Sequence, residues 1–164
     1  MKEISEKWVL VMKESAKQVQ LYLQQQGFTN EVIELPSSTR TVKEAAEAIG
    51  CHEAQIAKSI VFDIGGSALL VVASGLNRVS EERVATFIKA PLAKANVAFV
   101  REHTGYAIGG VPPVAHKYQP RILLDEDLWK YETIWAAAGH PMAVFQLTPD
   151  QLLQLTHGEV TKIK

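Results

Sequence analysis

Two β-rich runs separated by a pair of glycines constrain the fold of this chain more than any other feature. Residues 60–64 and 68–73 are rich in Ile, Leu, Val and Ala, and Gly65-Gly66 lies between them. A two-residue turn with positive φ angles is the most common closure of a β-hairpin, and glycine adopts such angles without steric cost. The sequence therefore predicts a β-hairpin over this segment.

Signals for helix starts and ends lie between the predicted strands. Thr41 and Glu44 form a capping box, in which each satisfies a free backbone N–H of the other, and Gly50 follows as a stop. Further helical segments are expected from Ser5 to Gly27, over residues 53–57, from Ser80 to about residue 89, over residues 126–129, and from Thr148 to just before Gly158.

The remaining β-rich runs complete the predicted fold. Strands are expected over residues 32–35, 97–100, 121–124, 133–137 and 143–147. Hairpins interspersed with helices indicate an α/β domain with a mixed, mainly antiparallel sheet, curved toward a barrel and surrounded by helices. Residues 1–28 are expected to form an N-terminal helix packed on the domain, which residues 29–164 form.

Composition limits the classes of partner. The chain has 164 residues and a formal net charge of −1, so DNA binding is not expected and any RNA contact should be local. Cys51 is the only cysteine, which excludes an internal disulfide and favours a reducing compartment. No apolar run approaches the roughly 20 residues of a membrane helix, and the charged N-terminus does not resemble a signal peptide. We expect a soluble cytoplasmic protein.

Common cofactor and metal motifs are absent. The sequence has no phosphate-binding loop, no dinucleotide fingerprint and no nucleophile elbow. The histidines are not paired with one another or with cysteine at the spacing of zinc ligands. These histidines are His52, His103, His116, His140 and His157. We therefore expect neither a metal ion nor a cofactor.

Lys58 is the first candidate site residue. It stands where a predicted helical turn gives way to a strand, and it would share a strand face with Ile60 and Phe62. Lysine is rarely fully buried without a partner. Two interpretations stay open: a strand-end lysine whose ammonium group reaches solvent, or a lysine that serves a functional site.

The second candidate is a loop that contains Gly105, Gly109, Gly110, Pro112 and Pro113. The loop spans residues 103–120, and loops as long as this are uncommon in compact domains unless they have a function. Glycine lets the backbone approach a ligand, and proline stiffens the chain, so such a loop could present N–H groups to a carbonyl or a phosphate. A rigid surface turn explains the same composition equally well.

The order of these features resembles the YbaK family, the free-standing relatives of the editing domain inserted in bacterial prolyl-tRNA synthetase. The resemblance covers roughly residues 30–156 and rests on five segments in sequence. These are residues 41–50 followed by 56–62, the Gly-x-x-x-Pro element at 109–113, Asp125, and residues 136–139. Together their order and spacing are more specific than any one of them.

The resemblance implies that Lys58, Gly109, Gly110 and Pro113 are catalytic. It implies substrate binding by Ser59, Val111, His116, Asp125, Gly139 and His140. From the residues alone, Asp125 could equally cap the helix at 126, and His140 is better explained as a loop histidine bonded to backbone. For His116, substrate binding and a backbone-bonded loop histidine both stay open. Ala115 stands where many relatives carry glycine.

The function implied is hydrolysis of the ester between a wrong small amino acid and the terminal adenosine of tRNA. The implied partners are the acceptor end of aminoacylated tRNA and an aminoacyl-tRNA synthetase. A non-catalytic module that binds aminoacyl-tRNA or a synthetase, and a different hydrolase, are the alternatives. The basic residues that could contact the acceptor end, each of which taken singly is better explained as a solvated surface charge, are Arg78, Arg83, Lys89, Lys94, Lys117 and Arg121.

Overall fold

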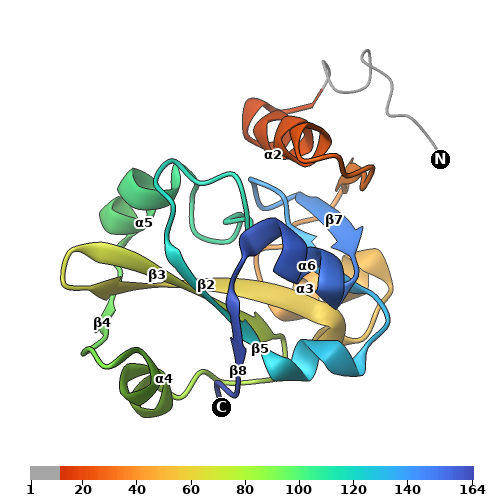
Figure 1. Ribbon diagram of the computed structural model, residues 1–164. Helices are drawn as coiled ribbons and strands as arrows, with labels where there is room; N and C mark the ends of the chain where they lie inside the picture. The colour runs from red at the N-terminus through yellow and green to blue at the C-terminus, as the bar shows by residue number, and fades with distance from the viewer. Residues whose placement is uncertain (1–11) are drawn as a thin grey trace.

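A computed structural model describes residues 12–164, which form one mixed sheet with helices on both faces (Figure 1). The strands lie in the order β1-β7-β6-β2-β3-β5-β8, and β4 pairs with β2. They are β1 (Val32–Glu34), β2 (Ile56–Ile64), β3 (Ser67–Ser74), β4 (Ala93–Lys94), β5 (Arg121–Asp125), β6 (Ile134–Ala137), β7 (Ala143–Leu147) and β8 (Glu159–Thr161). The helices are α2 (Glu14–Gln25), α3 (Val42–Ile49), α4 (Glu81–Ile88), α5 (Val97–Thr104) and α6 (Pro149–Thr156), with 3₁₀ turns η1 (Glu53–Gln55) and η2 (Glu126–Lys130).

The predicted hairpin is confirmed. β2 and β3 pair antiparallel from Ala57 to Ile64, and Gly65 and Gly66 both have positive φ, 71° and 95°. Four strand pairs are antiparallel, and the β2–β6, β3–β5 and β5–β8 pairs are parallel. The mixed, mainly antiparallel sheet is therefore as the sequence predicts.

The capping signals also locate the helices correctly. The capping boxes at Thr41 and Thr148 are both formed, and the Ser80 side chain accepts from the backbone of α4. The first helix differs from the prediction, because Lys13 has an extended conformation and α2 begins at Glu14. The predicted start at Ser5 lies outside the described residues.

The strand predicted over residues 97–100 is wrong, since these residues begin α5. The Asn96 side chain accepts from the N–H of Phe99, and Gly105 ends the helix in the left-handed conformation. These caps outweigh the β-propensity of two valines. Other differences are smaller: the helical turn predicted over 53–57 stops at Gln55, and the short strands β4 and β8 were not predicted.

The sheet is buried on both faces. Leu70 and Val72 of β3 join the main core, which includes α2 and α6, whereas Leu69 and Val71 pack with α4 on the other face. Figure 1 shows α2 and α4 at opposite ends of the molecule, with the sheet between them. Among residues 12–164, no helix is long and apolar enough to span a membrane.

Candidate functional site

The β2 strand is incompletely paired on one of its two sides. β3 pairs with it continuously from Ala57 to Ile64. On the other side, β6 pairs only with Ile56 and Ala57, and β4 pairs only with Phe62 and Asp63. A gap of four residues therefore separates β6 from β4 along this side of β2.

The hairpin turn determines which backbone groups face this gap. Ile64 and Ser67 flank the two-residue turn and form a hydrogen-bonded pair, and the direction of the backbone groups then alternates along the strand. The N–H and C=O of Lys58 consequently face β3. Those of Ser59 and Val61 face the gap, where no strand of the described chain pairs with them. This edge can therefore hydrogen-bond to a bound molecule.

The glycine-proline loop faces the gap and is fixed to the turn between β6 and β7. The N–H of Gly139 donates to the carbonyl of Gly110 at 2.9 Å, and the N–H of Gly110 donates to that of Ala107 at 3.0 Å. A Cβ atom at Gly110 would lie 2.5 Å from the Cα of His140, closer than real Cβ atoms approach. Glycine is thus required at this position by the close approach of two backbones.

Two cavities meet between the β2 edge and this loop. The smaller one, about 180 Å³, extends toward α3, β6 and β7, and the larger one, about 530 Å³, extends toward β4 and the start of α4. Both are lined by Lys58, Ser59, Ile108, Gly109 and Val111. These five residues therefore mark a junction between two spaces of different size.

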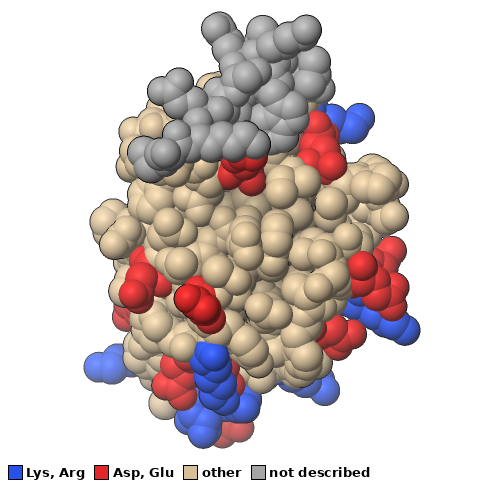
Figure 2. All heavy atoms as spheres, turned by 90° about the vertical axis from the view of Figure 1, so that its right-hand side faces the viewer, with Lys and Arg blue, Asp and Glu red and all other residues tan. Residues whose placement is uncertain are grey.

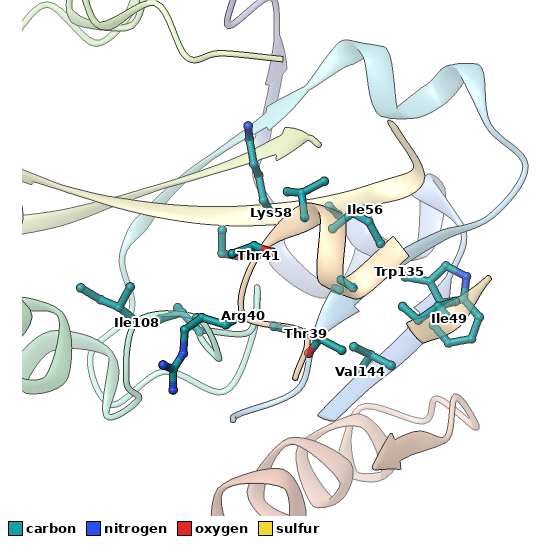
Figure 3. A pocket seen from close by; sticks show the side chains of 17 residues that line it. Thr39, Arg40, Thr41, Ile49, Ile56, Lys58, Ile108, Trp135 and Val144 are labelled. Carbon is teal, nitrogen blue, oxygen red and sulfur yellow. The ribbon is translucent and has the colours of Figure 1, made fainter. Parts of the chain in front are cut away.

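Lys58 is half-buried at this junction. Its ammonium group donates to the carbonyl of Gly75 at 3.2 Å. Burial lowers the pKa of Lys58, and the negative charge of Asp125 offsets part of this effect. Figure 3 shows the Lys58 side chain pointing away from the other labelled residues of the smaller cavity, and Arg40 pointing in the opposite direction. A positive charge is therefore held at the junction with one neutral hydrogen-bond partner.

Ser59 carries the unsatisfied group of the site. Its Oγ is buried and has no hydrogen-bond partner among the described residues. An unpaired buried hydroxyl costs about 1–3 kcal/mol. Ser59 lines both cavities, and its backbone N–H faces the gap beside β2.

Asp125 lines neither cavity and is held inside the protein. Its carboxylate accepts from the N–H of Ser74 at 2.9 Å, from Asn77 Nδ2 at 2.8 Å and from the N–H of Asp127 at 2.9 Å. It thus caps η2, one of the two roles open from the sequence. Its charge acts on Lys58 through space, without an ion pair to the ammonium group.

The two loop histidines also have internal partners. His116 Nε2 donates to the carbonyl of Pro112 at 2.6 Å, and burial lowers its pKa. His140 Nδ1 accepts from the N–H of Met142 at 3.1 Å, and its Nε2 contacts Glu34 at 2.9 Å. Neither ring lines either cavity. Residues 12–164 contain no group of three His, Cys, Asp or Glu that could hold a metal ion.

The structure therefore divides the predicted site residues into two groups. The residues at the cavity junction are Lys58, Ser59, Gly109 and Val111. The residues that support it from outside the cavity walls are Gly110, Pro113, His116, Asp125, Gly139 and His140. Sequence reasoning missed several wall residues, including Arg40, Ile49 and Trp135. Arg40 directly precedes a capping box and could have been noticed, whereas Trp135 reaches the site only through sheet pairing.

Comparisons with known proteins agree with this architecture. A model of the aminoacyl-tRNA editing domain matches residues 36–155. "Uncharacterized protein YwhH" of Bacillus subtilis is 34% identical over 149 residues, covering 89% of this chain and 94% of its own length. The "Putative Cys-tRNA(Pro)/Cys-tRNA(Cys) deacylase EbsC" of Enterococcus faecalis is 26% identical, covering 75% of this chain and 76% of its own.

A solved structure extends the agreement to the fold. The crystal structure of "a putative trans-editing enzyme for prolyl tRNA synthetase" superposes with a TM-score of 0.89 at 46% identity, covering 93% of this chain and 98% of that one. The family model spans well over half of the sequence, including both sides of the cavity junction. The chain therefore belongs to the family of aminoacyl-tRNA editing domains.

Proposed function

We propose that this protein is a trans-acting hydrolase that deacylates mischarged tRNA by cleaving the ester between a wrong small amino acid and the terminal adenosine. The observation that carries the proposal is the junction of two unequal cavities at Lys58, Ser59 and Gly109. An aminoacyl ester has a small group on one side and a nucleotide on the other. The smaller cavity would take the amino acid and the larger cavity the nucleotide.

The larger cavity has features that suit a nucleotide. Its walls include the apolar side chains of Ile60 and Phe62, and Arg78 and Lys94 add positive charge. An apolar surface suits a base, and the cations suit a phosphate. Glu81 also lines this cavity, so the positive charge there is modest.

The charge distribution supports a local contact with tRNA. On the face shown in Figure 2, acidic and basic side chains of the described residues lie mostly around the periphery, and no basic patch extends across that face. Binding would therefore depend on a few cations beside the cavities.

The reaction adds the oxygen of water to the ester carbonyl and then breaks the bond to the ribose oxygen, which takes up a proton. The developing oxyanion needs hydrogen-bond donors. Within the loop, Gly110 N–H already donates to Ala107 and the prolines have no N–H, whereas those of Ile108, Gly109 and Val111, which line both cavities, have no protein acceptor among the described residues. We assign the oxyanion to these amides and to Ser59, with Lys58 stabilising the negative charge.

No Asp, Glu or His among the described residues lines the smaller cavity, and Glu81 lies in the larger one. We therefore assign the general base to the substrate, whose neighbouring ribose hydroxyl adjoins the ester. The same observation favours the second candidate function, a module that binds aminoacyl-tRNA without hydrolysing it.

The test is release of amino acid from tRNA charged with alanine, serine, threonine or cysteine. We expect turnover by the wild type, at least a hundredfold loss in Lys58→Met, and little change in Lys162→Met, which removes an exposed lysine that lines neither cavity. Binding of charged tRNA without any release would support the non-catalytic module. Equal cleavage of free aminoacyl esters would contradict specificity for tRNA.

A further inference from the structure

The far end of the smaller cavity has an apolar wall. Ile49 and Trp135 lie together there with Val144, opposite Arg40 and Ile108 (Figure 3). These three side chains come from α3, β6 and β7, so the fold brings together segments separated by almost 100 residues. The end of the cavity away from the junction thus presents aliphatic and aromatic carbon.

The hydroxyl groups near this wall already have partners. Thr39 Oγ1 donates to the carbonyl of Pro141 at 2.8 Å, and Thr41 Oγ1 contacts the Glu44 carboxylate at 3.0 Å within the capping box. The hydroxyl of Ser59 has no partner, but it is enclosed by the protein, and Ser59 lies at the junction with the larger cavity. Among the described residues, no unpaired side-chain hydroxyl lines the apolar end.

The volume of about 180 Å³ limits the size of the group that fits. An engineered apolar cavity of about 150 Å³ in another protein accepts benzene, so this space can hold a small aliphatic side chain. At the apolar end of the cavity an added hydroxyl loses its hydrogen bonds to water, and the side chains of Ile49 and Val144 cannot replace them. A hydrophobic enzyme pocket typically rejects a hydroxylated isostere by about a hundredfold.

We propose that the smaller cavity selects small aliphatic aminoacyl groups, of alanine to valine size, over hydroxylated groups of the same shape. This proposal rests on the proposed function and adds the chemical class of the amino acid. Ile49, Trp135 and Val144 are the specificity-determining residues. Lys58 and Ser59 contact the ester end, which valine and threonine share.

The test compares valine and threonine, which have nearly the same shape, on one tRNA. We expect kcat/KM for Val-tRNA(Pro) to exceed that for Thr-tRNA(Pro) by about ten- to hundredfold, and Ala-tRNA(Pro) to exceed Ser-tRNA(Pro) in the same direction. If Thr-tRNA(Pro) is hydrolysed as fast as Val-tRNA(Pro) or faster, the proposed selectivity is wrong, whereas the proposed hydrolase activity still stands. Absence of turnover with every amino acid contradicts the hydrolase instead.

A binding measurement tests the selectivity without turnover. Calorimetry with 3′-amino-3′-deoxyadenosine carrying valine or threonine through a stable amide should give at least tenfold tighter binding of the valine compound. Equal binding, or binding of neither compound, overturns the proposal.

Two variants link the selectivity to the apolar wall. Val144→Thr places a hydroxyl there at constant shape and should narrow the valine preference several-fold, whereas Val160→Thr on the exposed strand β8 should leave it unchanged. Ile49 is half-buried at the apolar end of the cavity. Ile49→Ala enlarges this end and should raise the rate with Leu-tRNA(Pro) relative to the rate with Val-tRNA(Pro). Unchanged selectivity in both cavity variants would exclude this wall as its source.

Discussion

The N–H of Gly139 donates to the carbonyl of Gly110 at 2.9 Å, which fastens the loop at the candidate site to the turn between β6 and β7. The same two strands supply Trp135 and Val144 to the smaller cavity. The position of the loop and the shape of the cavity therefore share one support, and a change at this contact should affect both.

Gly110→Ala should disrupt this support. The added Cβ meets the backbone of His140, and relief of such a clash usually costs 1–3 kcal/mol, so we expect a loss of stability of about 2 kcal/mol. Because the loop must move, deacylation should fall at least tenfold in protein that is still folded. The control is Gly27→Ala at the end of α2, where φ is +82° and no atom lies near the new Cβ. That variant should lose about 1 kcal/mol of stability through backbone strain and keep its activity.

Ala115→Gly should stabilise the protein. Ala115 has a φ of +64°, a region in which the alanine Cβ is strained and glycine is not. The relief of backbone strain is partly offset by the greater conformational freedom of glycine in the unfolded chain. The free energy of unfolding should therefore rise by about 0.5–1 kcal/mol. Urea denaturation measures the gain, and Ala107→Gly, at ordinary φ in the same loop, should lose stability instead. A loss at both positions would mean that the strain at Ala115 is not significant.

His116 should make stability depend on pH. Its Nε2 donates to Pro112, and its buried Nδ1 has no partner among residues 12–164, so protonation would add an N–H with no acceptor. Burial lowers the folded-state pKa of His116 below its usual value near 6.5, although the Pro112 carbonyl opposes this shift. The unfolded chain therefore binds the proton more readily, and stability should fall as the pH drops below about 6.5 toward the folded-state pKa.

The comparison for this effect is His116→Gln, which keeps a donor for Pro112 and does not titrate. The free energy of unfolding should fall less between pH 7.5 and pH 5 in this variant than in the wild type. His157→Asn, at the C-terminal end of α6, should retain the wild-type dependence. Identical pH profiles for His116→Gln and the wild type would assign the effect to other groups.

Asp125→Asn should destabilise the fold. The carboxylate accepts three hydrogen bonds while it is 1% exposed, and an amide cannot accept all three. We expect a loss of about 2–3 kcal/mol, measured as a lower urea midpoint at constant m. Asp150→Asn, at a surface contact with Trp129, should change stability by less than about 0.5 kcal/mol. If Asp125 instead binds substrate, activity would fall without a change in the free energy of unfolding.

Much of the fold could be predicted from the sequence because its signals are local. The Gly65-Gly66 turn and the capping boxes at Thr41 and Thr148 each involve residues within three or four positions of one another. The error at residues 97–100 also has a local cause, since the β-branched valines favour a strand in the sequence, whereas the caps at Asn96 and Gly105 determine a helix in the structure. The strands β4 and β8 have two and three residues and depend on distant partners, so no local pattern marks them.

The candidate site was predictable to the extent that it lies in contiguous segments. Of the ten residues that the resemblance implies, Lys58, Ser59, Gly109 and Val111 line the cavity junction, and the other six line neither cavity. The apolar end could not be predicted, because Trp135 reaches it only when β6 pairs with the start of β2. Nor could the sequence reveal the gap in the pairing of β2.

Arg78 and Lys94 should control the salt dependence of tRNA binding. Both line the larger cavity, and with Lys58 they allow about three phosphate contacts at most. Each contact with a single-stranded end contributes about −0.7 to the slope of log K against log salt, which gives a total near −2. Arg78→Gln should reduce the magnitude of the slope by about 0.7. Arg121→Gln should not, because Arg121 is paired with Glu159 at 2.9 Å away from the cavities. A wild-type slope that implies eight or more contacts would require tRNA to cover a surface much larger than the two cavities, and the proposed mode of binding would then be wrong.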